Sequence, residues 1–218
     1  MTMKNYELIV FDMDGTILDT LTDITNSLNY VMREFGLKEH TYGQVRGYVG
    51  SGARVLFERA LSNNKDEALI DKCVGLFREY YHDHCKEKTA PYVGIIELLQ
   101  TLKDKGYKLA VVSNKPNDAV QVLCRDYFNN IFDFALGEKE GIAKKPAPDM
   151  VKCCLDYFGL PKESAIYIGD SDIDYLTSVN SGLDQILVTW GFKDEDFLKT
   201  FNAMYYVNTP EEIARILQ

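Results

Sequence analysis

The sequence predicts an α/β protein: a doubly wound, Rossmann-like parallel sheet core with an inserted helical cap domain. The first supporting observation is the apolar run at residues 8–11, which is typical of a central parallel strand buried on both faces. The second is the alternation of short apolar runs with helical patterns after residue 90, which indicates a parallel sheet covered by helices. The third is a helical stretch of roughly 65 residues between these two parts, which is longer than an ordinary crossover connection.

The inserted stretch divides into four expected helices, at residues 22–35, 42–48, 53–61 and 66–85. In the first of them, Ile24, Leu28 and Val31 follow helical spacing, and Gly36 marks the end of the pattern. We therefore assign residues 19–88 to a helical cap domain, and residues 1–18 together with 89–218 to an α/β core domain. The two connections, near residues 17–20 and 86–91, are the expected hinges.

The core elements are delimited by glycine and proline. Gly106 ends a helical pattern, and Pro116 suits a first helical position because its φ angle is fixed near the helical value. After the first strand, the expected strands span residues 108–113, 132–136, 165–168, 185–190 and 205–207. The expected helices span residues 93–105, 116–127, 148–158 and 172–182, and a terminal helix begins at Pro210.

Composition and charge limit the partners and the compartment. The net charge of −9 disfavours nucleic acid and anionic membranes as partners. No apolar run approaches the roughly 20 residues of a membrane span, and the first strand lies so near Met1 that we expect no signal peptide. The five cysteines show no C-x-x-C spacing, so we expect free thiols and a cytoplasmic protein. The sequence leaves open whether the chain is a monomer or a homodimer.

Polar side chains gather where the expected strands end. Asp12 and Asp14 follow the first strand directly, at the edge of an α/β sheet where ligands bind. Two carboxylates this close are unfavourable unless one pKa rises or a cation binds between them. The alternative is an ordinary Asx turn that uses Gly15. The later strand ends carry three further groups: 113–115 (Ser-Asn-Lys), 144–146 (Lys-Lys-Pro) and 169–174 (Gly-Asp-Ser-Asp-Ile-Asp).

This ordered set of residues resembles the motifs of the haloacid-dehalogenase superfamily. Residues 12–16 read D-M-D-G-T, which matches the superfamily pattern D-x-D-G-T. Ser113 matches its strand-terminal Ser or Thr, a lysine at 144 or 145 matches its third motif, and residues 169–174 match its acidic G-D-x-x-x-D. Each motif alone is weak evidence, but four in the correct order are specific. The resemblance implies a phosphotransferase core.

The resemblance also implies roles for these residues. Asp12 is the expected nucleophile that forms an aspartyl-phosphate, and Asp14 is the expected general acid and base. The expected phosphate-binding residues are Ser113, Asn114, Lys145 and Gly15, the backbone near Gly15 and Asn114 providing N–H groups. Lys145 is favoured over Lys144 because the lysine of the motif stands directly before proline.

Magnesium is the cofactor that the resemblance implies. Mg²⁺ prefers carboxylate, carbonyl and water oxygens. The expected direct ligands are Asp12, the backbone carbonyl of Asp14, and Asp170, while Asp174 orients them from behind. The alternative for the acids at 170–174 is that they favour the start of a helix electrostatically. Asp172 occupies a variable position of the motif, and we assign it no role.

The second aspartate narrows the class of reaction. Dehalogenases and phosphonate hydrolases of the superfamily lack an acid at this position, so Asp14 disfavours both. The resemblance implies a phosphatase acting on a small phosphorylated metabolite. A sugar phosphomutase is also compatible with these motifs, although residues 23–25 lack the histidine that such enzymes carry in the first cap helix. A phosphatase for nucleotides or pyrophosphate would carry the same core motifs and, remotely, so would a catalytically silent binding protein.

One segment of the expected cap indicates a substrate. Residues 49–61 resemble the G-x-G-A-x-V-L-x-E-R-A-L segment of bacterial phosphoglycolate phosphatases. Arg54 in this segment is a candidate partner for the carboxylate of phosphoglycolate. The alternative, which we favour, is a surface ion pair between Arg54 and Glu58, four residues further along the helix. His82 and His84 point in different directions on a helix and make a poor metal pair.

Overall fold

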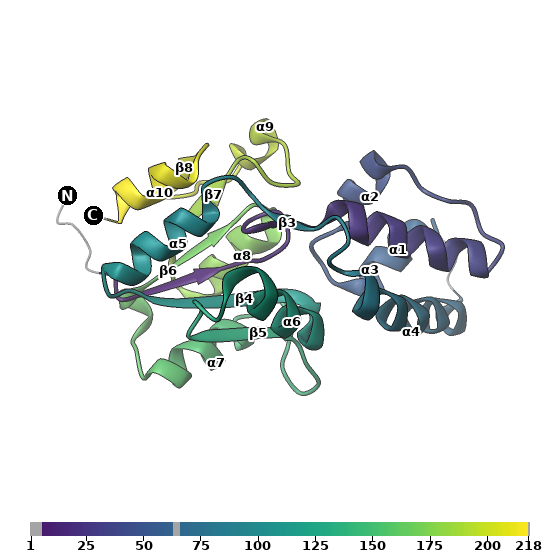
Figure 1. The fold of residues 1–218 in the computed structure, drawn as a ribbon, viewed down its shortest axis with the longest axis horizontal. Coiled ribbons are helices and arrows are strands. Elements are labelled where there is room, and N and C mark those ends of the chain that lie inside the picture. The colour runs from purple at the N-terminus through teal and green to yellow at the C-terminus, as the bar shows by residue number, and fades with distance from the viewer. Residues whose placement is uncertain (1–5, 63–65, 218) are drawn as a thin grey trace.

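A six-stranded parallel sheet forms the larger part of the molecule (Figure 1). The computed structural model describes residues 6–62 and 66–217. The strands are β1 (Leu8–Phe11), β4 (Lys108–Pro116), β5 (Phe134–Glu138), β6 (Ala165–Gly169), β7 (Asp184–Val188) and β8 (Tyr205–Val207). Their order is β5–β4–β1–β6–β7–β8, so the chain moves outward from β1 through β4 and β5 and then outward on the other side through β6, β7 and β8. This doubly wound order confirms the predicted fold class.

Helices cover both faces of the sheet because β1 is apolar on both faces. Ile9 and Phe11 belong to the core that α5 (Ile95–Asp104), α6 (Asn117–Phe128) and α10 (Pro210–Ile216) complete on one face. Leu8 and Val10 belong to the core that α7 (Asp149–Phe158) completes on the other face, with α8 (Asp172–Ser181) in contact with α7. Adjacent residues of a strand point to opposite faces, and a continuous apolar run therefore requires helices on both.

Four helices within residues 21–84 pack on one another beside the sheet (Figure 1). They are α1 (Leu21–Glu34), α2 (Tyr42–Tyr48), α3 (Ala53–Ala60) and α4 (Glu67–His84), and we call them the helical group. Leu28, Phe57 and Phe77 are buried at their contacts, and the rings of Phe57 and Phe77 meet edge to face. Residues 63–65 of the expected cap, and residues 1–5 and 218 of the expected core domain, lie outside the described residues.

The two connections to the helical group pair with each other. β2 (Leu18–Asp19) and β3 (Ala90–Pro91) form a two-stranded antiparallel sheet at the positions where we expect hinges. The buried carboxylate of Asp23 in α1 accepts hydrogen bonds from the backbone N–H groups of Lys88 and Thr89, and from the Thr89 hydroxyl. Strands of two residues leave no readable sequence pattern, so this pairing was not predicted.

Most element boundaries lie within two residues of the prediction. One difference is that α5 begins at Ile95 instead of residue 93, because Gly94 adopts a left-handed conformation at φ +86° just before it. A second is that β4 continues to Pro116, where a shift in register lets it pair with Glu138. The 3₁₀ helix at Lys162–Ser164 and the short helix α9 (Glu195–Leu198) were not predicted.

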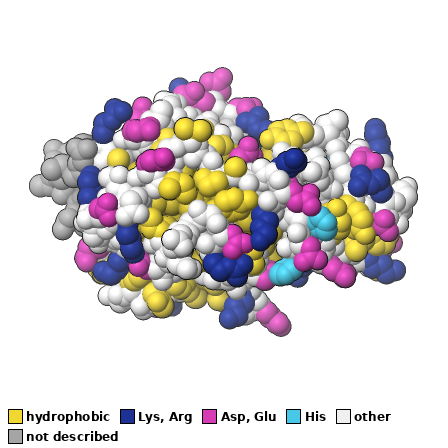
Figure 2. Space-filling view, in the orientation of Figure 1, with side chains coloured by type: hydrophobic (Ala, Val, Ile, Leu, Met, Phe, Trp, Pro, Cys, Tyr) yellow, Lys and Arg dark blue, Asp and Glu magenta, His cyan; other side chains and the backbone are white. Residues whose placement is uncertain are grey.

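Neither a membrane-spanning helix nor an extended basic surface is found in what the structure describes, the surface being judged on the face shown in Figure 2. Within residues 6–62 and 66–217, no helix combines the length and apolar character that crossing a membrane requires. Figure 2 shows one face of the molecule, on which acidic and basic side chains alternate without an extended region of either charge.

Candidate active site

The site lies at the carboxyl ends of three adjacent strands. Asp12 follows β1, Ser113 and Asn114 lie in the last part of β4, and Asp170 follows β6. Because β4 and β6 flank β1 in the sheet, the structure brings these four predicted residues to one place. All four side chains are buried, and Asp12 and Ser113 line the same cavity.

Three carboxylates meet at the base of the site. One oxygen each from Asp12, Asp170 and Asp174 lies within 4.8 Å of the other two. Burial and the nearby charge of Asp174 raise the pKa of Asp12 to about 7, against the opposing effect of Lys145. Burial and the same neighbouring carboxylates raise the pKa of Asp170 well above its ordinary value. A group of acids held this close has a high affinity for protons or for a cation.

The three acids differ in how many hydrogen bonds their carboxylate oxygens accept from the protein. Asp12 Oδ1 lies 2.8 Å from the ammonium nitrogen of Lys145, and no second partner of this oxygen is found among the described residues. Asp170 accepts a hydrogen bond from the backbone N–H of Phe192 at 2.7 Å and a longer one from the Thr16 hydroxyl. An incompletely satisfied buried carboxylate beside a second one fits a hard cation such as Mg²⁺.

Both carboxylate oxygens of Asp174, by contrast, accept hydrogen bonds from the protein. Its Oδ1 accepts hydrogen bonds from Lys145 and Tyr167. Its Oδ2 accepts from the N–H groups of Asp170 and Ser171 and from the Ser171 hydroxyl, within a capping box that begins α8. These bonds fix Asp174 next to the other two acids and leave it little capacity for a further ligand.

Lys145 supplies the positive charge that faces the acids. Its Nζ lies 2.8 Å from both Asp12 and Asp174. Burial alone would lower the pKa of Lys145, but the two carboxylates hold it well above the ordinary value. Asn114 fixes the lysine backbone, because its side chain donates to the Lys145 carbonyl and accepts from the Lys145 N–H. Lys144 instead points to Glu138 at 3.5 Å, outside this site, so Lys145 is the lysine beside the acids.

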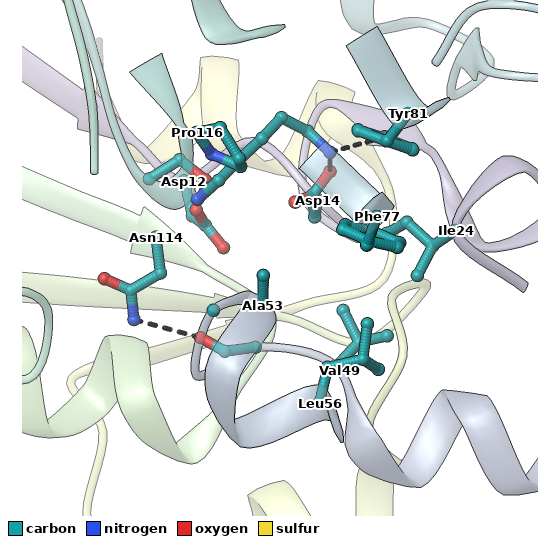
Figure 3. Close-up of a pocket in the computed structure, with 14 residues that line it drawn as sticks. Asp12, Asp14, Ile24, Val49, Ala53, Leu56, Phe77, Tyr81, Asn114 and Pro116 are labelled. Carbon is teal, nitrogen blue, oxygen red and sulfur yellow. Dashed lines mark hydrogen bonds and ion pairs between the residues drawn. The ribbon is translucent and has the colours of Figure 1, made fainter. Parts of the chain in front are cut away.

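The helical group closes one side of the cavity with apolar residues. Figure 3 shows Ile24, Val49, Leu56 and Phe77 opposite Asp12 and Asp14. The cavity has a volume of about 50 Å³. At about 10–15 Å³ for each enclosed water molecule, this is room for a small molecule only.

Comparison with known proteins identifies the family. A family model of haloacid dehalogenase-like hydrolases matches residues 9–188. The chain belongs to this family. A phosphoglycolate phosphatase of Aquifex aeolicus (strain VF5) is 34% identical over 186 residues, which cover 85% of each chain. Another from Aliivibrio fischeri (strain ATCC 700601 / ES114) is 31% identical over 196 residues, covering 87% of this chain and 86% of the relative.

Solved structures agree with this assignment. The crystal structure of a candidate phosphoglycolate phosphatase from Lactobacillus delbrueckii subsp. bulgaricus matches with a TM-score of 0.91 and 42% sequence identity, over 98% of each chain. A haloacid dehalogenase-like hydrolase from Streptococcus pneumoniae matches with a TM-score of 0.88 and 27% identity. Within the haloacid dehalogenase-like hydrolases, the chain is therefore a phosphatase.

Gly15 of this hydrolase has a structural role. The backbone near Gly15 was expected to provide N–H groups for phosphate, and the N–H of Gly15 itself donates to the carbonyl of Leu18 at 2.9 Å. A Cβ atom at this position would lie 2.3 Å from Asp170 Oδ2, and the backbone has φ +86°. Gly15 is therefore needed because the turn after Asp14 passes directly over Asp170 and requires a left-handed residue.

Asp14 points away from the three other acids. Its Oδ1 accepts a hydrogen bond from Thr20 at 2.7 Å and lies 2.8 Å from the Nζ of Lys115. Lys115 Nζ also donates to the hydroxyl of Tyr81 at 2.6 Å. Sequence reasoning placed Lys115 at a strand end but gave it no role, although it shares the strand face of Ser113, two residues earlier. Tyr81 was missed entirely, because it reaches the site from α4.

Burial affects the pKa of both Tyr81 and Lys115. Burial raises the pKa of the Tyr81 hydroxyl, so it stays protonated. Burial alone would lower the pKa of Lys115, but Asp14 and Tyr81 hold it above the ordinary value. The hydrolase thus has a neutral hydroxyl and a cation next to Asp14.

Arg54 is not part of the cavity lining. Its guanidinium contacts three carboxylates of the helical group, those of Glu58, Glu67 and Asp71. The geometry therefore supports a surface ion pair for Arg54. Its two partners on α4, Glu67 and Asp71, were not predicted from the sequence. His82 contacts Asp118 and His84 contacts the Tyr80 carbonyl, and neither belongs to a metal-binding group of the described residues.

An Arg54→Gln variant is expected to change kcat/KM for phosphoglycolate by less than about 2-fold, because exposed ion pairs contribute little. Steady-state phosphate release at several substrate concentrations measures this. A rise in KM of tenfold or more would return Arg54 to the substrate-binding residues.

Proposed function

We propose that this phosphatase hydrolyses 2-phosphoglycolate, or a phosphomonoester of similar size, with Mg²⁺ and through an aspartyl-phosphate on Asp12. The observation that carries the proposal is the cavity in which the Asp12 carboxylate faces Ser113, Asn114 and Asp14, with Lys145 2.8 Å behind it. A nucleophilic carboxylate, a proton-transferring acid and a cation are the groups that phosphomonoester hydrolysis requires.

The proposed reaction has two steps. Asp12 attacks phosphorus, and the bond from phosphorus to the ester oxygen breaks while Asp14 gives that oxygen a proton. Asp14 then takes a proton from water, which attacks the phosphorus of the aspartyl-phosphate and releases inorganic phosphate and free Asp12. Lys145 and the Ser113 hydroxyl bind the phosphoryl oxygens, whose charge must be balanced during the transfer.

Asp12 and Asp170, with the backbone carbonyl of Asp14, are the proposed Mg²⁺ ligands. The contact pattern supports this, because Asp12 Oδ1 has Lys145 as its one partner among the described residues, while both oxygens of Asp174 accept several hydrogen bonds from the protein. Asp174 is accordingly assigned to orienting Asp170 and Lys145. When bound, Mg²⁺ adds positive charge beside the phosphoryl group.

Residues 19–88 are proposed to be a cap domain that excludes water from the reaction. The apolar wall of the cavity comes from these residues, and the connections to them pair as β2 and β3. Excluding water strengthens the electrostatic interactions inside and protects the reactive aspartyl-phosphate. The five cysteines form no disulfide, which supports a reducing, cytoplasmic location.

The phosphoglycolate assignment is supported by the names of the relatives and by the small cavity. A sugar phosphomutase has less support. Asp23 stands near the position where such enzymes carry an assisting residue, but its carboxylate is committed to the backbone of Lys88 and Thr89. It is therefore not free to exchange protons with a substrate.

Phosphate release from a panel of phosphate esters tests the proposal. The panel contains 2-phosphoglycolate, sugar phosphates, nucleotides and pyrophosphate, each with Mg²⁺ and with a chelator. We expect the highest kcat/KM with 2-phosphoglycolate and no release with chelator. Equal kcat/KM values across the panel would contradict the substrate assignment, and absence of release from every compound would contradict the proposed reaction.

An Asp170→Ala variant is expected to need at least about 10-fold more Mg²⁺ for half-maximal activity, because loss of even an outer partner of a metal site costs this much. A readout without substrate is the rise in melting temperature on adding Mg²⁺, which should be smaller in the variant than in the wild type. An unchanged Mg²⁺ requirement together with an unchanged shift in melting temperature would remove Asp170 from the ligands.

A further inference from the structure

Two hydrogen-bond donors in the cavity have no use in the phosphoryl transfer proposed above. The ammonium group of Lys115 carries three hydrogens, of which two are directed to Asp14 and Tyr81. The Tyr81 hydroxyl accepts the bond from Lys115, so its own hydrogen has no acceptor among the described residues. Both side chains line the cavity, and they are 5% and 1% exposed. Buried donors of this kind normally have partners.

We propose that Lys115 and Tyr81 together bind a carboxylate located on the carbon next to the ester oxygen of the substrate, so that the enzyme selects phosphate esters of 2-hydroxy acids. This inference rests on the proposed function and makes it more specific. A carboxylate has two oxygens that accept such hydrogen bonds, and one ammonium hydrogen and one hydroxyl hydrogen are available to it.

The position of Lys115 determines where the carboxylate must be attached. Its Nζ lies 2.8 Å from the Asp14 carboxylate, the group assigned to protonating the ester oxygen. The ester oxygen and the cation are therefore neighbours, and a carboxylate one carbon away from that oxygen is the shortest arrangement that meets both. In 3-phosphooxypropanoate, which has one more carbon, the carboxylate has to fold back to reach Lys115, so we expect weaker binding.

The other walls of the cavity offer no second basic side chain for an anion. Lys115 is the one basic side chain among the described residues that line the cavity, and Arg54 is held by carboxylates outside it. The start of α3 at Gly52 and Ala53 forms one further wall, and Ile24, Leu56 and Phe77 form an apolar one. A carboxylate placed against these residues would lose its hydration without gaining a partner. The apolar wall instead accommodates hydrogen or a methyl group, so the phosphate ester of lactate is also an expected substrate.

Tyr81 makes recognition depend on the helical group. It lies on α4, whereas Lys115 belongs to β4 and Asp14 follows β1, on the sheet side of the cavity. The pair of donors is complete only when α4 rests against the end of β4. A substrate carboxylate bound by both would therefore hold the two parts of the molecule together around the reacting ester.

The experiment compares kcat/KM for 2-phosphoglycolate, 3-phosphooxypropanoate and ethyl phosphate, in which a methyl group replaces the carboxylate. The variant is Tyr81→Phe, which removes only the hydroxyl group. We expect it to lower kcat/KM for 2-phosphoglycolate by about 10- to 100-fold, the usual effect of losing a hydrogen bond to a charged group. For ethyl phosphate the change should stay within about 3-fold, since that ester makes no such bond.

Tyr80→Phe is the matched control. Tyr80 is the preceding residue on α4, its ring stacks on Tyr30, and it does not line the cavity, so all three kcat/KM values should stay at the wild-type level. The wild type should prefer 2-phosphoglycolate to both other esters. If Tyr81→Phe keeps that preference, or lowers all three kcat/KM values equally, the inference is wrong while the phosphatase proposal stands. If no variant or wild type releases phosphate from any ester, both proposals are wrong.

Discussion

The Asp12→Asn variant is expected to release phosphate at least about 10⁴-fold more slowly than the wild type, because removing a nucleophile commonly costs this much or more. The amide of asparagine cannot attack phosphorus and form the aspartyl-phosphate. Steady-state phosphate release measures the loss. Mass spectrometry of acid-quenched enzyme should detect a phosphorylated residue 12 in the wild type and none in the variant.

Stability distinguishes lost chemistry from lost folding in this variant. Burial and Asp174 raise the pKa of Asp12 to about 7, so the charged form is unfavourable in the metal-free protein. A neutral asparagine should therefore leave the melting temperature of the metal-free protein at or above that of the wild type. Asp172→Asn is the control, because Asp172 lies at the start of α8, its carboxylate is 3.8 Å from Lys193 Nζ, and it does not line the cavity, so the variant should keep its activity. Phosphate release by Asp12→Asn at a rate close to the wild type would exclude Asp12 as the nucleophile.

The Asp14→Asn variant is expected to accumulate the aspartyl-phosphate and to turn over about 10²- to 10⁴-fold more slowly, the usual contribution of a general acid and base. With p-nitrophenyl phosphate the leaving group needs no proton, so the first step should remain fast. The second step should be slow, because no group removes a proton from the attacking water. Rapid-mixing measurements should show a burst of p-nitrophenol of about one equivalent, followed by a slow phase.

The contacts of Asp14 indicate that Asp14→Asn should change proton transfer without moving the side chain. Asp14 is held by Thr20 and Lys115, and an asparagine side chain keeps an oxygen that can accept from both. The position of the side chain should therefore be retained while its capacity to exchange a proton is lost. Multiple turnovers at the wild-type rate, without a burst, would exclude Asp14 from proton transfer. Asp172→Asn serves as the control here too.

The parts of the site that lie at strand ends could be predicted from the sequence. Parallel strands place their carboxyl ends at one edge, so Asp12, Ser113 and Asp170 were expected at the same edge once the strands were recognised, while their adjacency came from the strand order β4–β1–β6. The acidic cluster followed from the same reasoning, except that the Asp14 carboxylate contacts Thr20 and Lys115 instead of the other three acids. No local sequence pattern reveals the side-chain direction of Lys115.

Contacts between distant segments could not be predicted. Tyr81 reaches Lys115 across 34 positions of the chain, through the packing of α4 against the end of β4. The sequence favoured Lys145 over Lys144 because it precedes proline, but the contact of Asn114 with the backbone of Lys145 was not predicted. Arg54 was compatible with either a substrate or a surface pair until the placement of Glu67 and Asp71 was known.

The pairing of β2 with β3 has a consequence for how the two parts of the molecule can move. Two independent linkers would let the helical group translate and rotate freely relative to the sheet. Because β2 and β3 are hydrogen-bonded side by side, they act as a single connection. Asp23 in α1 strengthens this connection, because its carboxylate accepts hydrogen bonds from the backbone N–H groups of Lys88 and Thr89, just before β3. We therefore expect any movement of the helical group to be mainly a rotation about this pair of strands. Such a rotation would bring Tyr81 back to the same place beside Lys115.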